Sequence, residues 1–281
     1  MGISSGHILA IDWASDELPT LPSVAHQLFA VLSDDMGKIS DLADIISKDP
    51  TLSIRVLRVA NSIFYSSGIE VTSIKHATVI LGINEITKIA LSAIMAERFL
   101  TVSNEVRPYA ASLWRHLLAT AVIAQDLAPF GEDDPDLYTL GLLHDIGWLV
   151  LMTQAPRVMM KLVEEEDVTR QEAERLWGVD HQLWGAKLLE KWRLPEPFQI
   201  AALRHHDPFI EIGPPDYLIR LSLADHLAHH LGAAVINKPE KEIDIKILER
   251  LAIDDNAFQE MKRDIVGRSD RFKSLWRTLS L

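Results

Sequence analysis

Signals for starting and ending a helix recur at short intervals along the whole chain, and they constrain its fold more than any other feature. In "SKDPTLSIRVLRVANS", Asp49 is a good N-cap, and Pro50 suits the first helical position, where no amide hydrogen bond is lost. Ser73 and Gly82 flank "IKHATVIL" as start and stop signals, and "TRQE" from Thr169 has the pattern of a capping box. Alternation with a period of two residues hardly occurs. These patterns predict an all-α protein.

One interruption of the helical pattern divides the chain. The segment "LTVSNEVRP", residues 100–108, separates two helical regions. The sequence therefore predicts an N-terminal tail (1–17), an N-terminal helical subdomain (18–104), a second helical subdomain (105–235) and a C-terminal helical extension (236–281). In the second subdomain, "DDPDLYTLGLLHDIGWLVLM" predicts one helix that starts at Asp134. His144 and Asp145 would lie in mid-helix, about 100° apart around its axis.

Charge and composition exclude several classes of function. The 40 Asp and Glu residues outnumber the 28 Lys and Arg, and the net charge of -12 repels a nucleic-acid backbone. Cysteine is absent, so any metal must be held by nitrogen and oxygen. The N-terminus lacks the basic and apolar regions of a signal peptide, and no run of about eighteen apolar residues could span a membrane. The expectation is a cytoplasmic protein that binds neither nucleic acid nor membrane.

His144 and Asp145 place an imidazole and a carboxylate side by side in an otherwise apolar segment. Burying an ionised carboxylate is costly unless it is paired or bound to a cation. Eight of the eleven histidines lie between positions 116 and 230, several of them on or at the end of apolar helices. Each alone is more often a core histidine bonded to a backbone carbonyl. Together they fit a metal site, because imidazoles from several helices can neutralise Asp145 through a shared cation.

The candidate ligands are five histidines and two aspartates: His116, His144, Asp145, His181, His205, His206 and Asp225. The first three and Asp225 would hold one ion, the other three histidines would hold a second, and Asp145 would bridge them. With a bridging water, this set nearly fills two six-coordinate ions and leaves positions for a ligand. Such nitrogen and oxygen ligands favour iron, manganese or nickel, with zinc or cobalt as alternatives, over magnesium.

The order of these residues resembles that of the HD superfamily of metal-dependent phosphohydrolases. In that pattern, a histidine, a His-Asp pair and a distant aspartate match His116, His144 with Asp145, and Asp225. The three extra histidines are similar to those of the HD-GYP subfamily, which holds two or three metals and opens cyclic dinucleotides. The N-terminal half resembles HDOD (HD-related output domain) proteins, because "LPTLP", "DPTL", "ANS" and "ATVILG" follow one another in the order of that family's signatures.

The two resemblances imply different functions on the same fold. The HDOD resemblance covers about residues 18 to 230 and implies an all-α, multi-helix bundle of HD type with an N-terminal helical subdomain. It also implies a signalling output module that acts on a protein partner. The HD-GYP resemblance implies the alternative, a metal-dependent phosphohydrolase or phosphodiesterase acting on a nucleotide or cyclic dinucleotide. In either case, phosphate or a nucleotide could be a ligand of the metals.

Two departures from catalytic HD-GYP proteins favour the signalling role. Trp148 stands where those proteins have a lysine suited to gripping phosphate, and no Gly-Tyr-Pro motif follows His205 and His206. Three cations elsewhere could replace that lysine: Arg115, Lys187 and Arg204. A solvated surface position is the more frequent one for each of them. A third interpretation, a bundle that uses neither metal nor substrate, would need hydrogen-bond partners for seven polar side chains in an apolar core.

Overall fold

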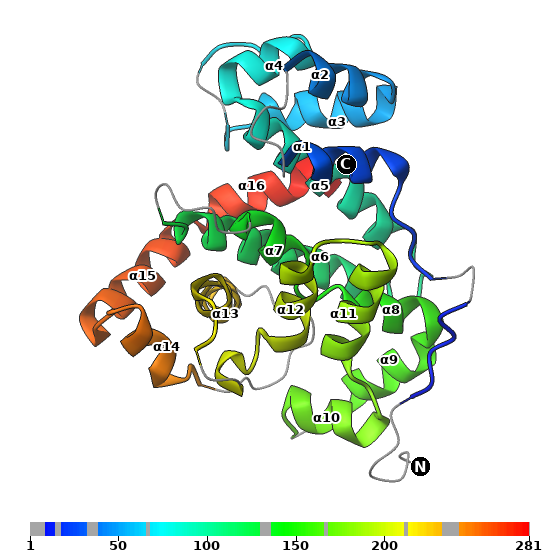
Figure 1. Cartoon of the computed structure of the whole chain (residues 1–281), viewed down its shortest axis with the longest axis vertical. Helices are drawn as coiled ribbons and strands as arrows, with labels where there is room; N and C mark the ends of the chain where they lie inside the picture. The colour runs from blue at the N-terminus through cyan, green and yellow to red at the C-terminus, as the bar shows by residue number, and fades with distance from the viewer. Residues whose placement is uncertain are drawn as a thin grey trace. The chain divides into compact units, whose positions relative to one another are not determined.

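The described part of the chain is helical throughout. The computed structural model describes residues 9–14, 18–32, 39–65, 68–129, 136–165, 168–210, 213–231 and 242–280. In these ranges there are helices and no strands (Figure 1), which confirms the all-α prediction. Across the same ranges, no helix is both long and apolar enough to span a membrane. The chain divides into two compact units.

Unit 1 consists of residues 1–19 and 101–266. Its helices are α6 (Arg107–Asp126), α7 (Leu137–Leu143), α8 (Gly147–Gln154), α9 (Pro156–Glu164), α10 (Arg170–Trp177), α11 (His181–Lys191), α12 (Glu196–Arg204), the 3₁₀ turn η1 (Pro208–Ile210), α13 (Asp216–His229), α14 (Ile245–Arg250) and α15 (Asp255–Gly267). Helix α6 packs on α7 and α13, and α11 packs on α8 and α12. Figure 1 shows α13 almost end-on, with α12 and α14 beside it. Helices distant in the chain are therefore neighbours in this core.

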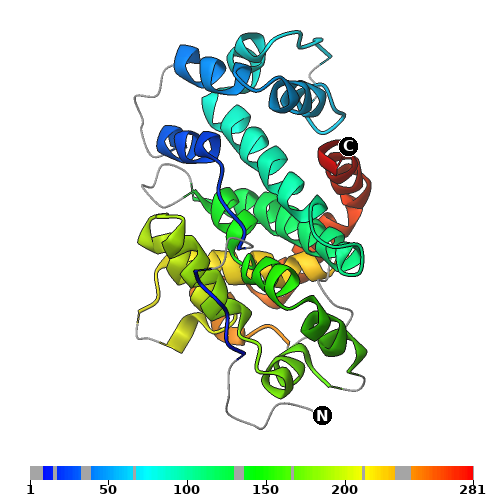
Figure 2. The same cartoon turned by 90° about the vertical axis from the view of Figure 1, so that its right-hand side faces the viewer.

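Unit 2 consists of residues 20–100 and 267–281. Its helices are α1 (Ser23–Leu32), α2 (Ile39–Ser47), α3 (Pro50–Ala60), α4 (Ile74–Leu81), α5 (Ile83–Leu100) and α16 (Ser269–Ser280). Figure 2 shows the long helix α5 between α1 and α16, and it packs on both. The segment 236–281 is thus shared between the units, because α14 and most of α15 belong to unit 1 and α16 belongs to unit 2.

The predicted helix caps are confirmed where they are local. The Asp49 carboxylate accepts hydrogen bonds from the backbone amides of the first turn of α3, with Pro50 in the first helical position. Ser73 caps α4, and Gly82 ends it with a positive φ of 88°. Thr169 and Glu172 form both halves of a capping box at α10. These interactions span three residues or fewer, so the sequence alone specifies them.

The predicted helix around His144 and Asp145 is wrong in one respect. Its expected start at Asp134 lies outside the described residues, and the described helix α7 is capped by Asp136. Helix α7 ends at Leu143 and α8 begins at Gly147, so His144 and Asp145 lie in a turn and not in mid-helix. The backbone amides of Ile146 and Trp148 each donate a hydrogen bond to the carbonyl oxygen three residues earlier, with N···O distances of 3.1 Å. Hydrogen bonds to the third residue back tighten the turn, so that one helix ends and the next begins. The spacing of apolar residues does not reveal this change.

The turn brings two helix backbones into direct contact. A Cβ atom on Gly147 would lie 1.8 Å from the carbonyl oxygen of His181 and 2.7 Å from the amide nitrogen of Gly185. Both of those atoms belong to the backbone of α11, which packs on α8. Glycine is therefore required at position 147 by close approach.

Candidate metal centre

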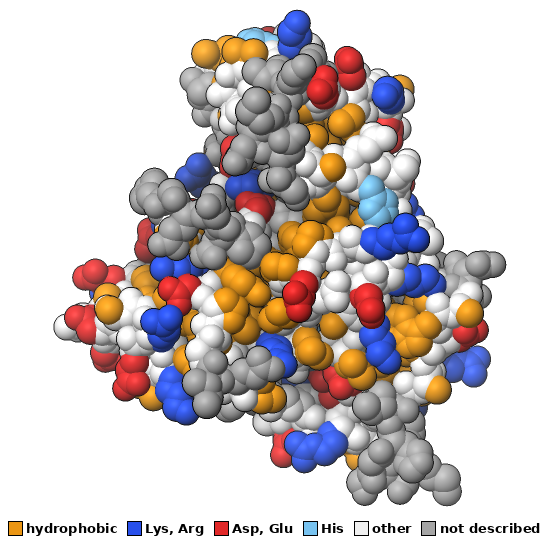
Figure 3. Space-filling view, viewed as in Figure 1, with side chains coloured by type: hydrophobic (Ala, Val, Ile, Leu, Met, Phe, Trp, Pro, Cys, Tyr) orange, Lys and Arg blue, Asp and Glu red, His pale blue; other side chains and the backbone are white. Residues whose placement is uncertain are grey.

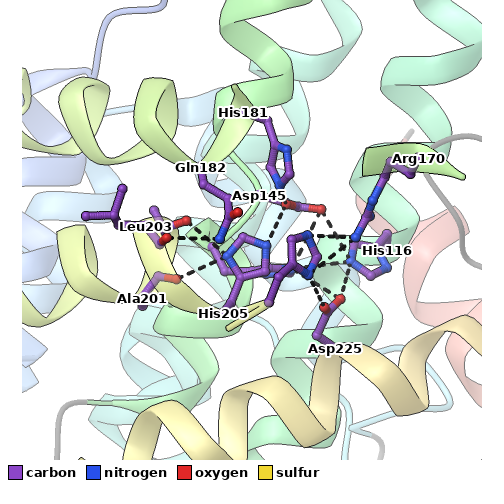
Figure 4. A network of polar contacts seen from close by, with 12 residues as sticks. His116, Asp145, Arg170, His181, Gln182, Ala201, Leu203, His205 and Asp225 are labelled. Carbon is purple, nitrogen blue, oxygen red and sulfur yellow. Dashed lines mark hydrogen bonds and ion pairs between the residues drawn. The ribbon is translucent and has the colours of Figure 1, made fainter. Parts of the chain in front are cut away.

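All seven predicted ligands meet in the interior of unit 1. Figure 4 labels five of them: His116, Asp145, His181, His205 and Asp225. They come from α6 (His116), the α7–α8 turn (His144, Asp145), the start of α11 (His181), the end of α12 (His205, His206) and α13 (Asp225). Six of these side chains are buried and His206 is half-buried. The structure therefore brings together, from five elements, groups that the sequence separates by up to 109 positions (116 to 225).

The two oxygens of Asp145 face different halves of the cluster. Oδ1 lies 3.2 Å from Nε2 of His181 and 3.1 Å from Nε2 of His205. Oδ2 lies 3.6 Å from Nε2 of His116 and 3.8 Å from Nε2 of His144. In Figure 4 the labelled imidazoles surround this carboxylate. Two ligands bound to one ion at about 2.1 Å and at a right angle lie about 3.0 Å apart, so these separations suit shared coordination.

Asp225 also contacts histidines from several helices. Its Oδ1 lies 2.9 Å from Nε2 of His116 and 3.5 Å from Nε2 of His144, and its Oδ2 lies 3.6 Å from Nδ1 of His206. His229, one helical turn further along α13, lies 3.5 Å from the same Oδ1 and joins His116 and Asp225 in a potential metal-binding group. His229 is not among the ligands that the sequence predicts. The spacing of four residues from Asp225 was the available signal.

Several buried atoms of the cluster have the donor chemistry that a metal requires. Both oxygens of Asp145, Oδ1 of Asp225 and the Nε2 atoms of His181 and His205 make no hydrogen bond, although all are buried. The short N···O contacts around them are not aligned as hydrogen bonds. Buried polar groups without hydrogen-bond partners cost about 1 to 3 kcal/mol each, and a shared cation would compensate them together. The residues therefore fit a transition-metal site of nitrogen and oxygen ligands.

The opposite ring nitrogens are held by other groups. Nδ1 of His144 contacts the carbonyl oxygen of Gly141 at 2.8 Å, and Nδ1 of His205 contacts that of Ala202 at 3.0 Å. A carbonyl can only accept, so the proton is on Nδ1 and Nε2 keeps its lone pair toward the cluster. Each of these rings can therefore bond a backbone carbonyl through Nδ1, as a core histidine does, and still bind a metal through Nε2.

His181 is held by a carboxylate that is not among the predicted site residues. Its Nδ1 donates to Oε2 of the buried Glu174 on α10 at 2.9 Å. Burial by itself lowers the pKa of His181, but Glu174 and Asp145 outweigh that effect and raise the pKa to about 9. The same two carboxylates thus fix the ring orientation and favour positive charge at this position.

The aspartates are ionised despite their burial. Desolvation raises the pKa of Asp145, but the imidazoles of His144 and His181 outweigh it and hold the pKa well below the usual range. The pKa of Asp225 is also held well below that range, because the close contacts and the charge of His116 and the neighbouring imidazoles exceed the effect of burial. Two buried carboxylates that stay negatively charged attract cations strongly.

Trp148 packs against one of the histidines of the cluster. Its indole ring is fully buried and stacks on the imidazole of His181, with ring centroids 4.9 Å apart and planes inclined by 15°. Of the three cations considered as substitutes for a lysine at this position, Arg115 and Lys187 are exposed and Arg204 is half-buried. None of these three side chains belongs to the pocket beside the cluster.

A pocket of about 450 Å³ opens beside the cluster. His205, His206 and Asp225 form its inner wall, and the rest of the lining comes from the start of α10, residues 207–210, α13 and the segment 242–247. Arg170, the first residue of α10, is part of this lining. Candidate metal ligands are therefore reachable by a small molecule.

Replacing Glu174 with glutamine should lower metal affinity about tenfold or more, the range typical of losing an outer-shell carboxylate. The amide removes the charge opposite His181 and accepts its N–H less strongly. Titration of the metal-free protein with Mn²⁺ or Ni²⁺ would measure the effect. Glu190→Gln, at an exposed site on α11, is the matched control and should bind metal like the parent protein. Equal affinities for both variants would contradict the orienting role.

The helical unit and its His/Asp cluster define an HD-type class of protein. The HDOD domain model matches residues 18–208, so the chain belongs to the HDOD domain family. This confirms the resemblance drawn from the N-terminal motifs.

Comparisons with individual proteins agree with this assignment. The chain is similar to an HDOD domain protein of unknown function from Geobacter sulfurreducens, with 26% identity, a TM-score of 0.79 and coverage of 95% of this chain and 94% of that one. A protein from Shewanella amazonensis has 23% identity, a TM-score of 0.72 and coverage of 94% and 96%, which shows the shared fold. An uncharacterised protein from Treponema pallidum (strain Nichols) is 27% identical over 209 residues. That match covers 72% of this chain and 40% of the longer relative.

Proposed function

We propose that the chain is a signal-transduction output module whose unit 1 binds two transition-metal ions. The observation that supports this most is the convergence of five histidines and two aspartates in which five buried atoms make no hydrogen bond, with Asp145 facing both halves. His116, His144, Asp145 and Asp225 would hold one ion, and Asp145 would share the second ion with the other three histidines. Iron, manganese or nickel suits this set best, with zinc or cobalt next.

A protein is the proposed partner of the module. Large apolar side chains of unit 2 are exposed on α3, on α4 and in the segment between them, including Ile54 (58%), Ile63 (82%), Ile69 (56%) and Val79 (67%). Apolar side chains of this size at a surface favour protein contacts. Nucleic acid is disfavoured by the net charge of -12. On the face seen in Figure 3, basic and acidic side chains are interspersed and form no continuous basic stripe.

Elemental analysis tests the metal site directly. Protein purified without chelators should contain about two transition-metal ions per chain, or take them up on reconstitution. Metal should also raise the unfolding midpoint, because an ion at 100 times its Kd stabilises the native state by about 2.7 kcal/mol. Metal content near zero, with no uptake and no shift in the midpoint, would refute this part of the proposal.

A metal-dependent phosphodiesterase is the second candidate, and the pocket beside His205, His206 and Asp225 is the observation that favours it. When bound, paired ions supply a nucleophile from water and stabilise charge on phosphoryl oxygens. The residues around them must still hold those oxygens, and the indole of Trp148 offers one neutral N–H where a lysine would offer a cation. Hydrolysis is therefore the less favoured function.

We expect the metal-loaded protein to hydrolyse cyclic di-GMP and generic phosphodiesters slowly or not at all. Loss of a charge-assisted contact of about 3 kcal/mol slows a reaction about a hundredfold, so weak activity agrees with this expectation. Turnover by the manganese-, iron- or nickel-loaded protein is the measurement, with Asp145→Ala as control. A rate near the roughly 10 s⁻¹ typical of enzymes, abolished in the control, would show that the chain is an enzyme.

A further inference from the structure

Arg170 lines the pocket beside the candidate metal centre and contacts one of its ligands. Its side chain is nearly buried, with 8% exposure, and its Nη2 lies 2.7 Å from Nε2 of His206. The other ring nitrogen, Nδ1, is farther away at 3.4 Å and lies 3.6 Å from Oδ2 of Asp225. Figure 4 shows the Arg170 side chain extending toward the cluster. The guanidinium is therefore directly bonded to a proposed ligand.

This hydrogen bond uses the one lone pair that His206 can offer. A guanidinium only donates, so Nε2 must be the acceptor and the ring proton must be on Nδ1. A neutral imidazole has a single acceptor nitrogen. A metal bound through Nε2 would take the place of Arg170, and a metal bound through Nδ1 would move the proton to Nε2, which could then no longer accept. Arg170 and a metal thus compete for His206 through either nitrogen.

The charges around the pocket give the displaced arginine a role. Among the described residues that line it, Arg170 is the only lysine or arginine. Asp225 lies at the inner wall, and three exposed acidic side chains lie elsewhere on the lining: Asp207, Glu242 and Asp244. Without added cations, this pocket repels an anion. Two divalent ions and a guanidinium turned into the pocket would reverse the sign at its inner end.

We propose that Arg170 couples occupation of His206 by metal to the binding of a phosphoryl anion in the pocket. With His206 free of metal, Arg170 stays on the imidazole. When a metal takes that ring, the guanidinium turns into the pocket and binds the anion beside the metals, where its fork of N–H groups matches phosphoryl oxygens. This inference rests on the proposed metal site, and it identifies the class of ligand and the residue that recognises it.

The test measures metal and anion binding separately in Arg170→Met. Calorimetric titration of the metal-free protein with Mn²⁺ should show the second ion binding about tenfold more tightly than in the parent protein, because its competitor is gone. Titration of the metal-saturated variant with inorganic phosphate should show affinity reduced about tenfold or more. Arg175→Met removes one charge from an exposed position of the same helix and should change neither value. If the methionine variant fails to fold, Arg170→Gln replaces it, and the same loss of phosphate affinity is expected.

The outcomes separate this inference from the proposed function. Weaker metal binding in Arg170→Met would mean that the arginine only positions His206, and it would overturn the competition. Phosphate affinity equal to that of the parent would overturn the anion-binding role. If the parent protein binds no metal at all, the proposed function fails together with this inference. If the parent protein binds metal and Arg170→Met has the same affinities for Mn²⁺ and phosphate, the proposed function stands and only the coupling by Arg170 fails.

Discussion

Replacing Asp145 with alanine is expected to remove both metal ions together. Its Oδ1 lies near His181 and His205, and its Oδ2 lies near His116 and His144, so one substitution removes a ligand from each half. The imidazoles would also lose the buried negative charge that offsets the charge of an ion. Because the carboxylate is a direct ligand in the proposal, affinity should fall by more than the roughly 10- to 100-fold typical of outer-shell residues.

Metal content and calorimetric titration measure this effect. Asp145→Asn keeps the shape of the side chain and separates loss of metal from loss of fold, which circular dichroism monitors. Asp270→Ala removes a carboxylate that is 95% exposed in unit 2 and should retain full metal content. One ion remaining at full occupancy in Asp145→Ala would show that this carboxylate is not the bridge.

The second large effect is expected from Gly147→Ala. The added methyl group would meet the carbonyl oxygen of His181 at 1.8 Å and the amide of Gly185 at 2.7 Å. These atoms belong to a helix backbone and cannot rotate away as a side chain would, so α8 and α11 must separate. Overpacking typically costs about 1 to 3 kcal/mol, and a clash between backbones should reach or exceed the upper value. Because α11 begins at His181, metal binding should weaken as well.

Thermal unfolding would reveal the destabilisation as a fall of roughly 10 °C in the midpoint, given about 2 to 4 °C per kcal/mol for a unit of this size. Gly267→Ala is the control, since a Cβ atom there meets nothing within 4 Å. It should leave the midpoint almost unchanged or raise it slightly. A Gly147→Ala protein as stable as this control would show that α8 and α11 can move apart at little cost.

The amino-acid sequence by itself determined the helical class and much of the local structure. The caps at Asp49, Ser73 and Thr169 were predictable because each involves groups within three residues of one another. Histidines and an aspartate in apolar segments also identified candidate ligands, because burying such groups requires partners. The family motifs then placed the chain among HDOD domains, as the match over residues 18–208 shows.

Only the tertiary structure decided how those residues are used. The turn between α7 and α8 brings Gly147 against the backbone of α11, and no local pattern encodes that contact. Arg170 contacts His206, 36 positions further along the chain, and Glu174 and His229 join the cluster because their helices lie around it. Helix α16 belongs to unit 2 for the same reason. Caps are fixed by short-range hydrogen bonds, whereas a site built from several helices and a turn depends on packing between segments distant in the chain.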